Sequence, residues 1–150
     1  SMKVEEVMIR DVISVNRNSS IEEIVEVLTK NKLSGIPVLS DGGYLVGMVT
    51  EGDLLRLETT PRLPEFINLL GAVIYYHGVD TYNEDFKKML AQKAADIMTE
   101  DVITVKEGTD IAEVVHLMLD HNIKQVPVVD GSKIVGMVAR ADIIKLLLNK

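Results

Sequence analysis

The chain contains an internal repeat, and this feature constrains its fold more than any other. Residues 7–39 align without a gap with residues 97–129, and after one residue is lost in a turn, residues 41–53 align with residues 130–142. The identical pairs are Met8/Met98, Asp11/Asp101, Val12/Val102, Ile13/Ile103, Val15/Val105, Ile21/Ile111, Glu23/Glu113, Val25/Val115, Pro37/Pro127, Val38/Val128, Asp41/Asp130, Gly42/Gly131, Val46/Val135, Gly47/Gly136, Met48/Met137, Val49/Val138 and Asp53/Asp142. This duplication predicts two copies of one structural unit.

Local signals predict the same order of elements in both copies. The helix after the first strand is opened by Ser20 or Asp110, with Glu23 or Glu113 in the capping-box position. The expected elements are strands at 12–15, 36–39 and 44–49 with helices from Ser20 and Glu51 in the first copy, and strands at 102–105, 126–129 and 133–138 with helices from Asp110 and Arg140 in the second. Each copy is therefore a β-α-β-β-α unit.

The domain organisation follows from the extent of the duplication. We expect a first repeat at 2–56, a helical connector at 57–95 and a second repeat at 96–150. The connector contains an apolar stretch at 63–76 and a charged helical segment at 83–93. Because it is long for a structureless loop, we expect it to be ordered.

Composition excludes several classes of function. The net charge is 16 Lys and Arg minus 23 Asp and Glu, 16 − 23 = −7, and an acidic protein is a poor ligand for the phosphate backbone of nucleic acids. The chain also has four Tyr, two Phe and no Trp, so few aromatic side chains are present for base stacking. At 47% hydrophobic residues the chain can form a sizeable core. No apolar run is long enough for a bilayer and no leader is recognised, so we expect a cytoplasmic protein without a membrane partner.

Neither catalysis nor metal binding has candidate residues. The absence of Cys excludes disulfides and thiolate chemistry. The histidines His77, His116 and His121 show no metal-ligand spacing with carboxylates. No Gly-rich phosphate loop, nucleophile elbow or pair of catalytic carboxylates is found. We therefore expect a protein that is not an enzyme and requires no cofactor.

The repeated motifs resemble those of CBS domains, small modules named after cystathionine β-synthase. The resemblance lies in Ile-Met-Thr at 97–99 with 101–105, in the strands GIPV at 35–38 and QVPV at 125–128, and in the junctions GMVTEGD at 47–53 and GMVARAD at 136–142. Each motif is short, but the same set in the same order twice is typical of a tandem CBS pair.

The resemblance implies an α/β fold in which two β-α-β-β-α repeats pack with pseudo-twofold symmetry and form two clefts. In many members these clefts bind adenosine-containing effectors such as AMP, ADP, ATP or S-adenosylmethionine. Members usually regulate another protein rather than catalyse a reaction, so a regulated partner would here be a separate chain. Members also often pair into a disc of four repeats.

The junction at 50–53 has the chemistry that such a ligand needs. Free backbone N–H groups at a helix start suit phosphate oxygens, and Asp53 in the first turn could accept hydrogen bonds from ribose hydroxyls. The alternative is a helix cap, because Thr50 and Asp53 have capping-box spacing. The second copy favours the ligand, since Asp142 is kept although Ala139 replaces the capping Thr50.

The two junctions differ in charge, and we expect unequal clefts. Arg140 is the best candidate for a phosphate contact, whereas Glu51 at the same place in the first copy disfavours phosphate. Aliphatic strand residues could flank an adenine ring. Family analogy adds Ser14 and Thr104, although hydroxyl side chains are also ordinary in strands. The candidate ligand-binding residues are Ser14, Ile36, Pro37, Val38, Thr50, Asp53, Thr104, Lys124, Val126, Pro127, Arg140 and Asp142.

Two main functions stay open at this point. One is a regulatory module that senses an adenosine-type ligand and signals to a partner protein. The other is a constitutive dimerisation or interaction module with empty clefts. A homodimer is expected because the connector adds apolar surface that a small monomer cannot easily hide, unless this segment folds back over its own repeats. The apolar residues concerned are Phe66, Ile67, Leu69, Leu70, Val73 and Ile74.

Overall fold

The structure is a computed structural model that describes residues 1–57, 84–146 and 148, and these form two compact units. Unit 1 consists of Ser1–Ile13, Gly42–Leu45 and Asp101–Lys150, and unit 2 of Ser14–Asp41 and Val46–Glu100. Each unit has its own cluster of buried apolar side chains. The compact units therefore interleave segments of the two copies rather than following the boundaries of the duplication.

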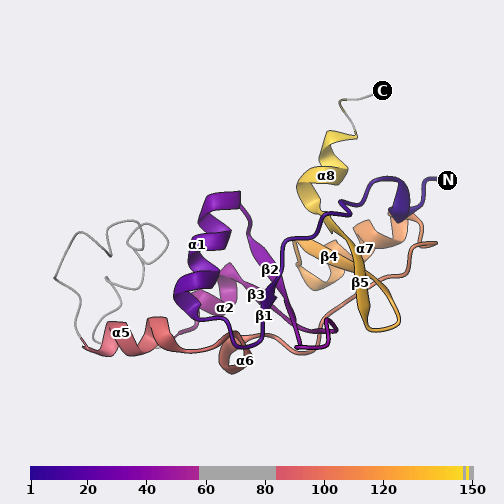
Figure 1. Cartoon of the computed structure of the whole chain (residues 1–150). Coiled ribbons are helices and arrows are strands. Elements are labelled where there is room, and N and C mark those ends of the chain that lie inside the picture. Colours follow the sequence, from indigo (N-terminus) through magenta and orange to yellow (C-terminus); the bar gives the residue numbers. More distant parts are fainter. Residues whose placement is uncertain (58–83, 147, 149–150) are drawn as a thin grey trace. The chain divides into compact units, whose positions relative to one another are not determined.

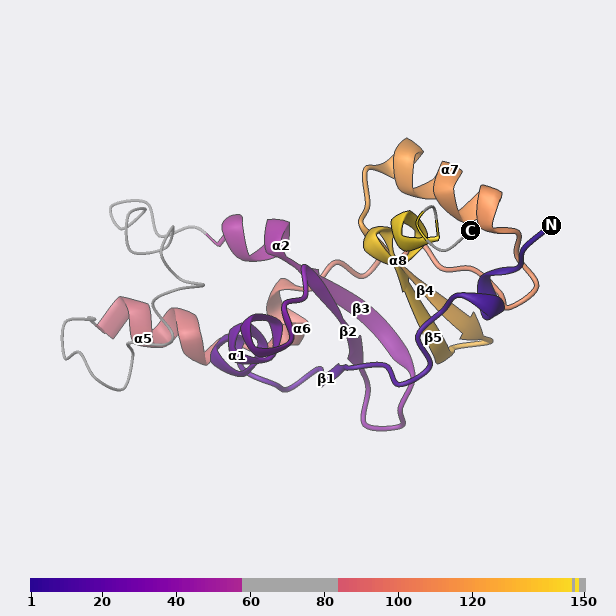
Figure 2. The ribbon, with the colours of Figure 1, turned by 90° about the horizontal axis from the view of Figure 1, so that it is seen from above.

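Unit 2 is an α/β unit built on a three-stranded sheet with the order β1-β2-β3. Its elements are β1 (Val15–Asn16), α1 (Ile21–Asn31), β2 (Gly35–Leu39), β3 (Leu45–Thr50), α2 (Glu51–Leu55), α5 (Glu84–Ala91) and α6 (Ala94–Ile97). Figures 1 and 2 show α1 and α2 on the same side of these strands. The core lies between this side of the sheet and α1, which packs on β2 and α5.

Helix α1 forms where its sequence predicts it. Ser20 Oγ accepts a hydrogen bond from Glu23 N at 3.1 Å, which satisfies one of the free amides at the helix start. Its apolar residues recur at helical spacing, so one face is buried in the core. The helix ends at Asn31, and the capping residue Lys32 has a φ of 54°, the left-handed conformation common after a last turn. In the second copy Asp110 is the N-cap of its helix, as predicted, but its side chain makes no bond to that helix, so the expected capping box is not formed.

The first strand of each copy is shorter than predicted. The expected strand at 12–15 is reduced to Val15–Asn16, which pairs in parallel with β2, and the one at 102–105 to a single parallel bridge between Val105 and Val128. Proline explains both. One step further toward the N-terminus, the parallel ladder would need an N–H from Pro37 or Pro127, and proline has none.

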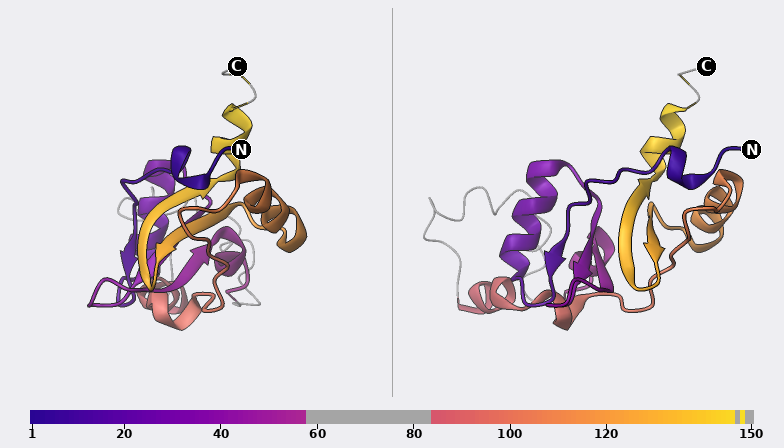
Figure 3. Two further views of the ribbon diagram at one scale, coloured as in Figure 1. Left: turned by 90° about the vertical axis from the view of Figure 1, so that its right-hand side faces the viewer. Right: turned by 45° about the vertical axis from the view of Figure 1, so that its right-hand side comes forward.

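Unit 1 is built on an antiparallel hairpin. Its elements are η1 (Val4–Glu6), α7 (Ile111–His121), β4 (Gln125–Asp130), β5 (Lys133–Ala139) and α8 (Arg140–Lys145). The hairpin that the strands predicted at 126–129 and 133–138 require is present, and Gly131 in its turn has a φ of 63°, which favours glycine. A register shift between Val128 and Val129 bends the hairpin, and the curvature of β5 is visible in Figure 3.

An incoming segment completes each unit, namely residues 2–9 in unit 1 and residues 92–99 in unit 2. Each segment accepts a hydrogen bond from the first residue of the first helix. Met2 O accepts from Ile111 N, and Gln92 O accepts from Ile21 N, both at 2.9 Å. Each then forms an antiparallel bridge to the last strand, Ile9 with Met137 and Thr99 with Met48. These bonds recur at equivalent positions of the two segments, as expected of duplicated units, and unit 2 adds a bond from Ala95 N to Arg17 O at 2.9 Å.

A methionine of each incoming segment lies directly over a glycine of the bridged strand. A Cβ built on Gly136 would lie 2.4 Å from Met8 Sδ, and one on Gly47 would lie 2.6 Å from Met98 Sδ. These distances are shorter than non-bonded atoms tolerate, so only glycine allows the close approach. The glycine that both junction motifs share, Gly47 or Gly136, therefore serves packing.

A surface ion pair also holds the incoming segment of unit 1. Lys3 Nζ lies 2.6 Å from Asp110 Oδ1, and the two side chains are 43% and 46% exposed. The hydrogen bond with Asp110 raises the pKa of the Lys3 ammonium, and the same bond lowers the pKa of the Asp110 carboxyl. Because both groups are exposed, this pair adds little to stability.

The charged part of the connector is helical, as predicted. Met89 and Leu90 of α5 are buried in the core of unit 2, so this part of the connector packs on the repeat. The apolar stretch at 63–76, on which the expectation of a homodimer rests, lies outside the described residues. No helix of the described residues is both long and apolar enough to cross a bilayer.

Replacing Gly47 by Ala should destabilise the protein. The added methyl would meet Met98 Sδ at 2.6 Å and the backbone oxygen of Thr99 at 3.0 Å, and overpacking of this kind costs about 1–3 kcal/mol. Chemical denaturation measures the change in the free energy of unfolding. Gly108→Ala is the matched control, because a Cβ there would meet nothing within 4 Å. Equal losses in the two variants would contradict the packing role of Gly47.

Candidate functional site

The predicted acid of the first copy, Asp53, lies at the start of α2 and is almost completely buried, with 6% of its surface exposed. Its Oδ2 accepts hydrogen bonds from Thr50 N at 2.9 Å and from Thr50 Oγ1 at 3.1 Å. Thr50 Oγ1 in turn accepts from Asp53 N at 3.3 Å, which completes a capping box. The cap that the sequence left as an alternative is therefore present.

Two further groups reach the same carboxylate. Asp53 Oδ1 accepts from Thr99 Oγ1 at 2.8 Å and pairs with the Arg56 guanidinium at 2.5 Å. Thr99 belongs to the incoming segment of unit 2, and Arg56 follows α2 directly. All four bonds to this carboxylate lie within unit 2.

The acid of the second copy, Asp142, has a different environment. It lies half-buried in the first turn of α8, and its Oδ2 accepts a hydrogen bond from Ala139 N at 2.9 Å. Within residues 1–57, 84–146 and 148, this is the one hydrogen bond that its carboxylate makes. The reason is visible in the duplication, since Ala139, Ile9 and Lys145 replace Thr50, Thr99 and Arg56. Asp142 therefore keeps acceptor positions that a ligand could use.

The residues beside the two acids give the two junctions different charges, basic at the second junction and acidic at the first. At the second junction Arg140 N donates to Lys124 O at 2.8 Å, so a main-chain bond brings two basic residues together at the end of β5 and the start of β4. At the first junction the corresponding bond joins Glu51 N to Ser34 O at 3.0 Å. Arg140 and Lys124 are both exposed. The second junction suits an anion, and the first does not.

The candidate strand residues divide between core and opposite face. Ile36, Val38 and Val126 are fully buried and belong to the apolar clusters of their own units. Because strand side chains alternate, Pro37 and Pro127 point to the opposite face, where both are buried as well. Pro127 O accepts a hydrogen bond from Val105 N at 3.1 Å. A ligand contact from the three core residues stays a prediction, and their burial favours a packing role.

The two candidate hydroxyl residues lie next to the short parallel pairings. Ser14 directly precedes β1, and Thr104 directly precedes the bridge of Val105 with Val128. Both side chains are half-buried. Their contact with a base or sugar stays a prediction.

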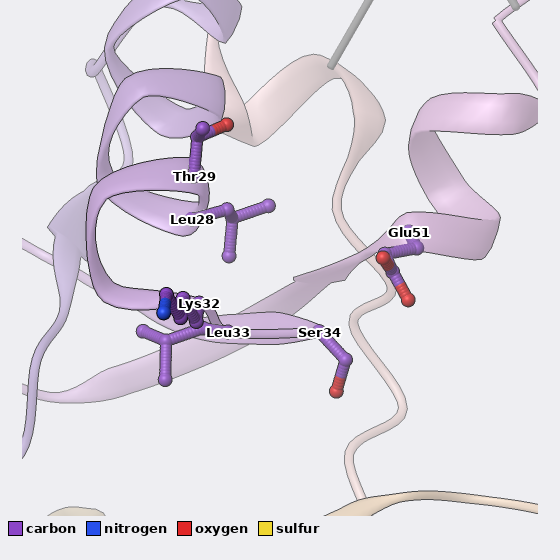
Figure 4. Close-up of a pocket in the computed structure, with 6 residues that line it drawn as sticks. All are labelled: Leu28, Thr29, Lys32, Leu33, Ser34 and Glu51. Atoms are coloured by element: carbon purple, nitrogen blue, oxygen red, sulfur yellow. The ribbon is translucent and has the colours of Figure 1, made fainter. Parts of the chain in front are cut away.

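A hollow of about 320 Å³ opens in unit 2 between the end of α1 and the start of α2. Figure 4 shows Leu28 and Thr29 on the α1 wall and Glu51 across the gap at the start of α2. The remaining lining residues are Lys32, Leu33 and Ser34. No sequence motif predicts this hollow, because the end of an amphipathic helix carries no pattern specific to a pocket.

The described residues contain no cluster of three or more His, Cys, Asp or Glu side chains that could hold a metal ion. Of the three histidines, His116 and His121 lie exposed on α7 and His77 lies outside the described residues.

Sequence reasoning missed Thr99 and Arg56, which complete the environment of Asp53. Thr99 is 46 positions from Asp53 in the chain, and no local motif links them. A signal was nevertheless present in the duplication, because Ile9 and Lys145 occupy the equivalent positions. Where the two copies share a residue but differ at the positions around it, the two shared residues have different environments.

Comparisons with known proteins agree with this architecture. The protein MJ1426 of Methanocaldococcus jannaschii is 32% identical over 155 residues, which cover 98% of this chain and 92% of MJ1426. The structure of CBSX2 in complex with AMP has a TM-score of 0.74 at 26% identity, and the match covers 99% of this chain and 98% of the chain in that structure. The CBS domain pair of MJ0100, solved with 5-methylthioadenosine and S-adenosylmethionine, has a TM-score of 0.70 at 25% identity and covers 99% and 97%.

The family assignment rests on the duplicated part of the sequence. The CBS domain model matches residues 4–59 and again residues 94–149. Both copies of the repeat are matched, which confirms the tandem pair that the motifs predicted, and the α/β fold with two repeats is confirmed as well. With these two matches spanning more than half of its residues, the chain belongs to the CBS domain family.

Proposed function

We propose that this protein is a regulatory module that binds an adenosine-type ligand and signals its occupancy to a partner protein, without catalysing a reaction. The ligand class comprises AMP, ADP, ATP and S-adenosylmethionine. The observation that carries the proposal is the second junction, where Arg140, Lys124 and the half-buried Asp142 lie on neighbouring chain segments.

The two basic residues support binding of a phosphate group. The main-chain bond of 2.8 Å between Arg140 N and Lys124 O holds their backbones together, so both side chains start from one place on the surface. A guanidinium offers two parallel donors to phosphate oxygens, and a nearby ammonium adds a second charge. A nucleotide is therefore preferred over an uncharged adenosine derivative at this junction.

The acid at the same junction supports recognition of a sugar. Asp142 accepts one hydrogen bond through Oδ2, from Ala139 N. A carboxylate can accept about four, so it has capacity for the two vicinal hydroxyls of a ribose. Phosphate donors and a sugar acceptor at one place select a nucleotide rather than a free phosphate, whose negative charge Asp142 would repel.

The structures of relatives support the same ligand class. CBSX2 was solved with AMP, and the CBS pair of MJ0100 with 5-methylthioadenosine and S-adenosylmethionine. All three molecules contain an adenosine moiety. The scarcity of aromatic residues here agrees with an adenine that lies between aliphatic side chains and bonds to strand backbone.

The second candidate function is a constitutive interaction module, and exposed apolar side chains favour it. Leu119 on α7 is 73% exposed, Ile144 on α8 is 53% exposed, and Leu55 on α2 is 61% exposed. Each of these side chains offers apolar surface that a partner chain could cover. This function and ligand sensing are compatible, since a regulatory module must also contact its partner.

An adenosine-type ligand should raise the melting temperature. A ligand that binds only the folded state, at about 100 times its dissociation constant, adds about 2.7 kcal/mol of stability. A thermal-shift series with AMP, ADP, ATP and S-adenosylmethionine at millimolar concentration measures this effect. If none of the four changes the melting temperature, the module is constitutive and the sensing function is wrong.

Replacing Arg140 by Glu should weaken AMP binding roughly 10- to 150-fold, because a charge-assisted hydrogen bond contributes about 1.5–3 kcal/mol. Adenosine, which lacks the phosphate, should lose much less affinity. Calorimetry with both ligands separates the two effects. The matched control is Glu51→Arg, which makes the opposite change at the first junction and should not weaken AMP binding. An equal loss for AMP and adenosine would show that Arg140 does not contact phosphate.

The protein should be a homodimer in solution. Leu55, Leu119 and Ile144 are exposed apolar side chains that a second copy could cover, and the sequence at 66–74 is rich in apolar residues. Light scattering at micromolar concentration measures the mass directly. A mass near 16.6 kDa that does not change with concentration would contradict the dimer.

A further inference from the structure

We propose that Met98 is an oxidation site, at which a peroxide converts the thioether to the sulfoxide and so loosens the incoming segment of unit 2 from β3. This modification concerns the folded chain and needs no ligand, so it stands apart from the proposed function. It gives one member of the duplicated pair Met8/Met98 a reactivity that the other member does not share.

The sulfur chemistry of this chain is limited to methionine. The sequence contains seven Met and no Cys, and all seven Met lie within the described residues. A thioether reacts with a peroxide only where the oxidant can reach it, so exposure ranks the seven. Met2 is 45% exposed and Met98 is half-buried. The other five are at most 8% exposed, namely Met8, Met48, Met89, Met118 and Met137.

Of the two accessible methionines, Met98 is the one that packs on the fold. Its side chain lies against the apolar cluster of unit 2. Its Sδ and Cγ lie over Gly47 of β3, at 2.6 and 2.8 Å from the place that a Cβ on this glycine would take. The side chain of Met2 lies on the surface. Oxidation of Met98 therefore has a structural consequence that oxidation of Met2 lacks.

The reaction balances with a peroxide as the only co-reactant. With hydrogen peroxide, a lone pair of the Met98 sulfur attacks one oxygen, the S–O bond forms and the O–O bond breaks. The departing hydroxide takes the proton of the transferred hydroxyl and leaves as water. The sulfur loses two electrons and the peroxide gains two. The product carries a polar, hydrogen-bond-accepting oxygen on a side chain that was apolar.

The main-chain amides next to this side chain are already paired and do not receive the new oxygen. Met98 N donates to Ala94 O at 2.9 Å. Thr99 N donates to Met48 O at 2.8 Å, and Met48 N donates to Thr99 O at 2.9 Å. A polar oxygen held against apolar side chains without a donor is unfavourable, so the sulfoxide gains by turning toward water. That rotation removes the sulfur from Gly47 and uncovers the edge of the core.

The second copy has the same contact without the same access. Met8 lies over Gly136 as Met98 lies over Gly47, but Met8 is 8% exposed and belongs to the apolar cluster of unit 1. The two methionines precede equivalent main-chain bridges in one protein. A difference between their rates of oxidation therefore reports their exposure, and Met8 is the internal control.

Peptide mass spectrometry after treatment with millimolar hydrogen peroxide tests the site itself. Met2 and Met98 should gain one oxygen atom first, and Met98 should react at least about tenfold faster than Met8, because exposure governs access of the oxidant. If Met8 reacts as fast as Met98, the proposal is wrong.

The melting temperature tests the structural consequence. Oxidation of the parent should lower it by roughly 3–8 °C, and a methionine sulfoxide reductase supplied with a dithiol should restore it. Met98→Leu conserves the volume and removes the sulfur, so it should melt near the parent and keep its melting temperature in peroxide. Met2→Leu is the matched control and should lose as much on oxidation as the parent does. If oxidised Met98→Leu loses as much as the oxidised parent, Met98 is not the site that matters.

A permanent polar group makes the test independent of the oxidant. Met98→Gln carries an amide on a side chain of similar length, and it should lower the melting temperature without peroxide by an amount similar to oxidation of the parent. Met2→Gln, on an exposed side chain, should melt like the parent. If Met98→Gln melts like Met98→Leu, the strand accepts a polar group over Gly47 and the proposal is wrong.

Discussion

Each unit depends on the main-chain bridge between its incoming segment and its last strand. The bridge uses backbone groups alone, so it forms both with Thr99 and with Ile9. It requires that no side chain stands between the two backbones, and Gly47 and Gly136 meet this requirement. Once the bridge is made, the methionine before it covers the strand and closes the core beneath α1 or α7. Removal of the glycine would affect the bridge, the methionine and the core together.

Much of this architecture could be predicted from the sequence because the duplication gives every signal twice. Strands β2 to β5, helices α1 and α7 and the hairpin turn at Gly131 lie within a residue or two of their expected positions. The length of the first strand of each copy was overestimated. An apolar pattern indicates which residues are buried, whereas the length of a parallel pairing depends on the backbone N–H donors of the neighbouring strand. The exchange of the incoming segments could not be predicted, since periodicity describes each element by itself and not the element on which it packs.

The candidate site was predicted with unequal success for the same reason. The junction acids and Arg140 stand out because they lie beside a strand end and a helix start. The environment of Asp53 does not stand out, because Thr99 approaches from a distant part of the chain and is recognised only in three dimensions. Ile36 and Val126 illustrate the opposite case, in which a motif position is explained by burial in its own unit. Equal sequence at duplicated positions is therefore weak evidence of equal chemistry.

The interleaving of the two copies has an evolutionary consequence. A duplicated gene usually keeps the option of losing one copy, because each encodes a complete fold. Here residues 2–9 complete the unit of the second copy and residues 92–99 complete that of the first, so a deletion of either repeat removes part of both units. Single substitutions, by contrast, stay local to one unit. The two repeats are thus inherited together, although their sequences could still diverge at single positions.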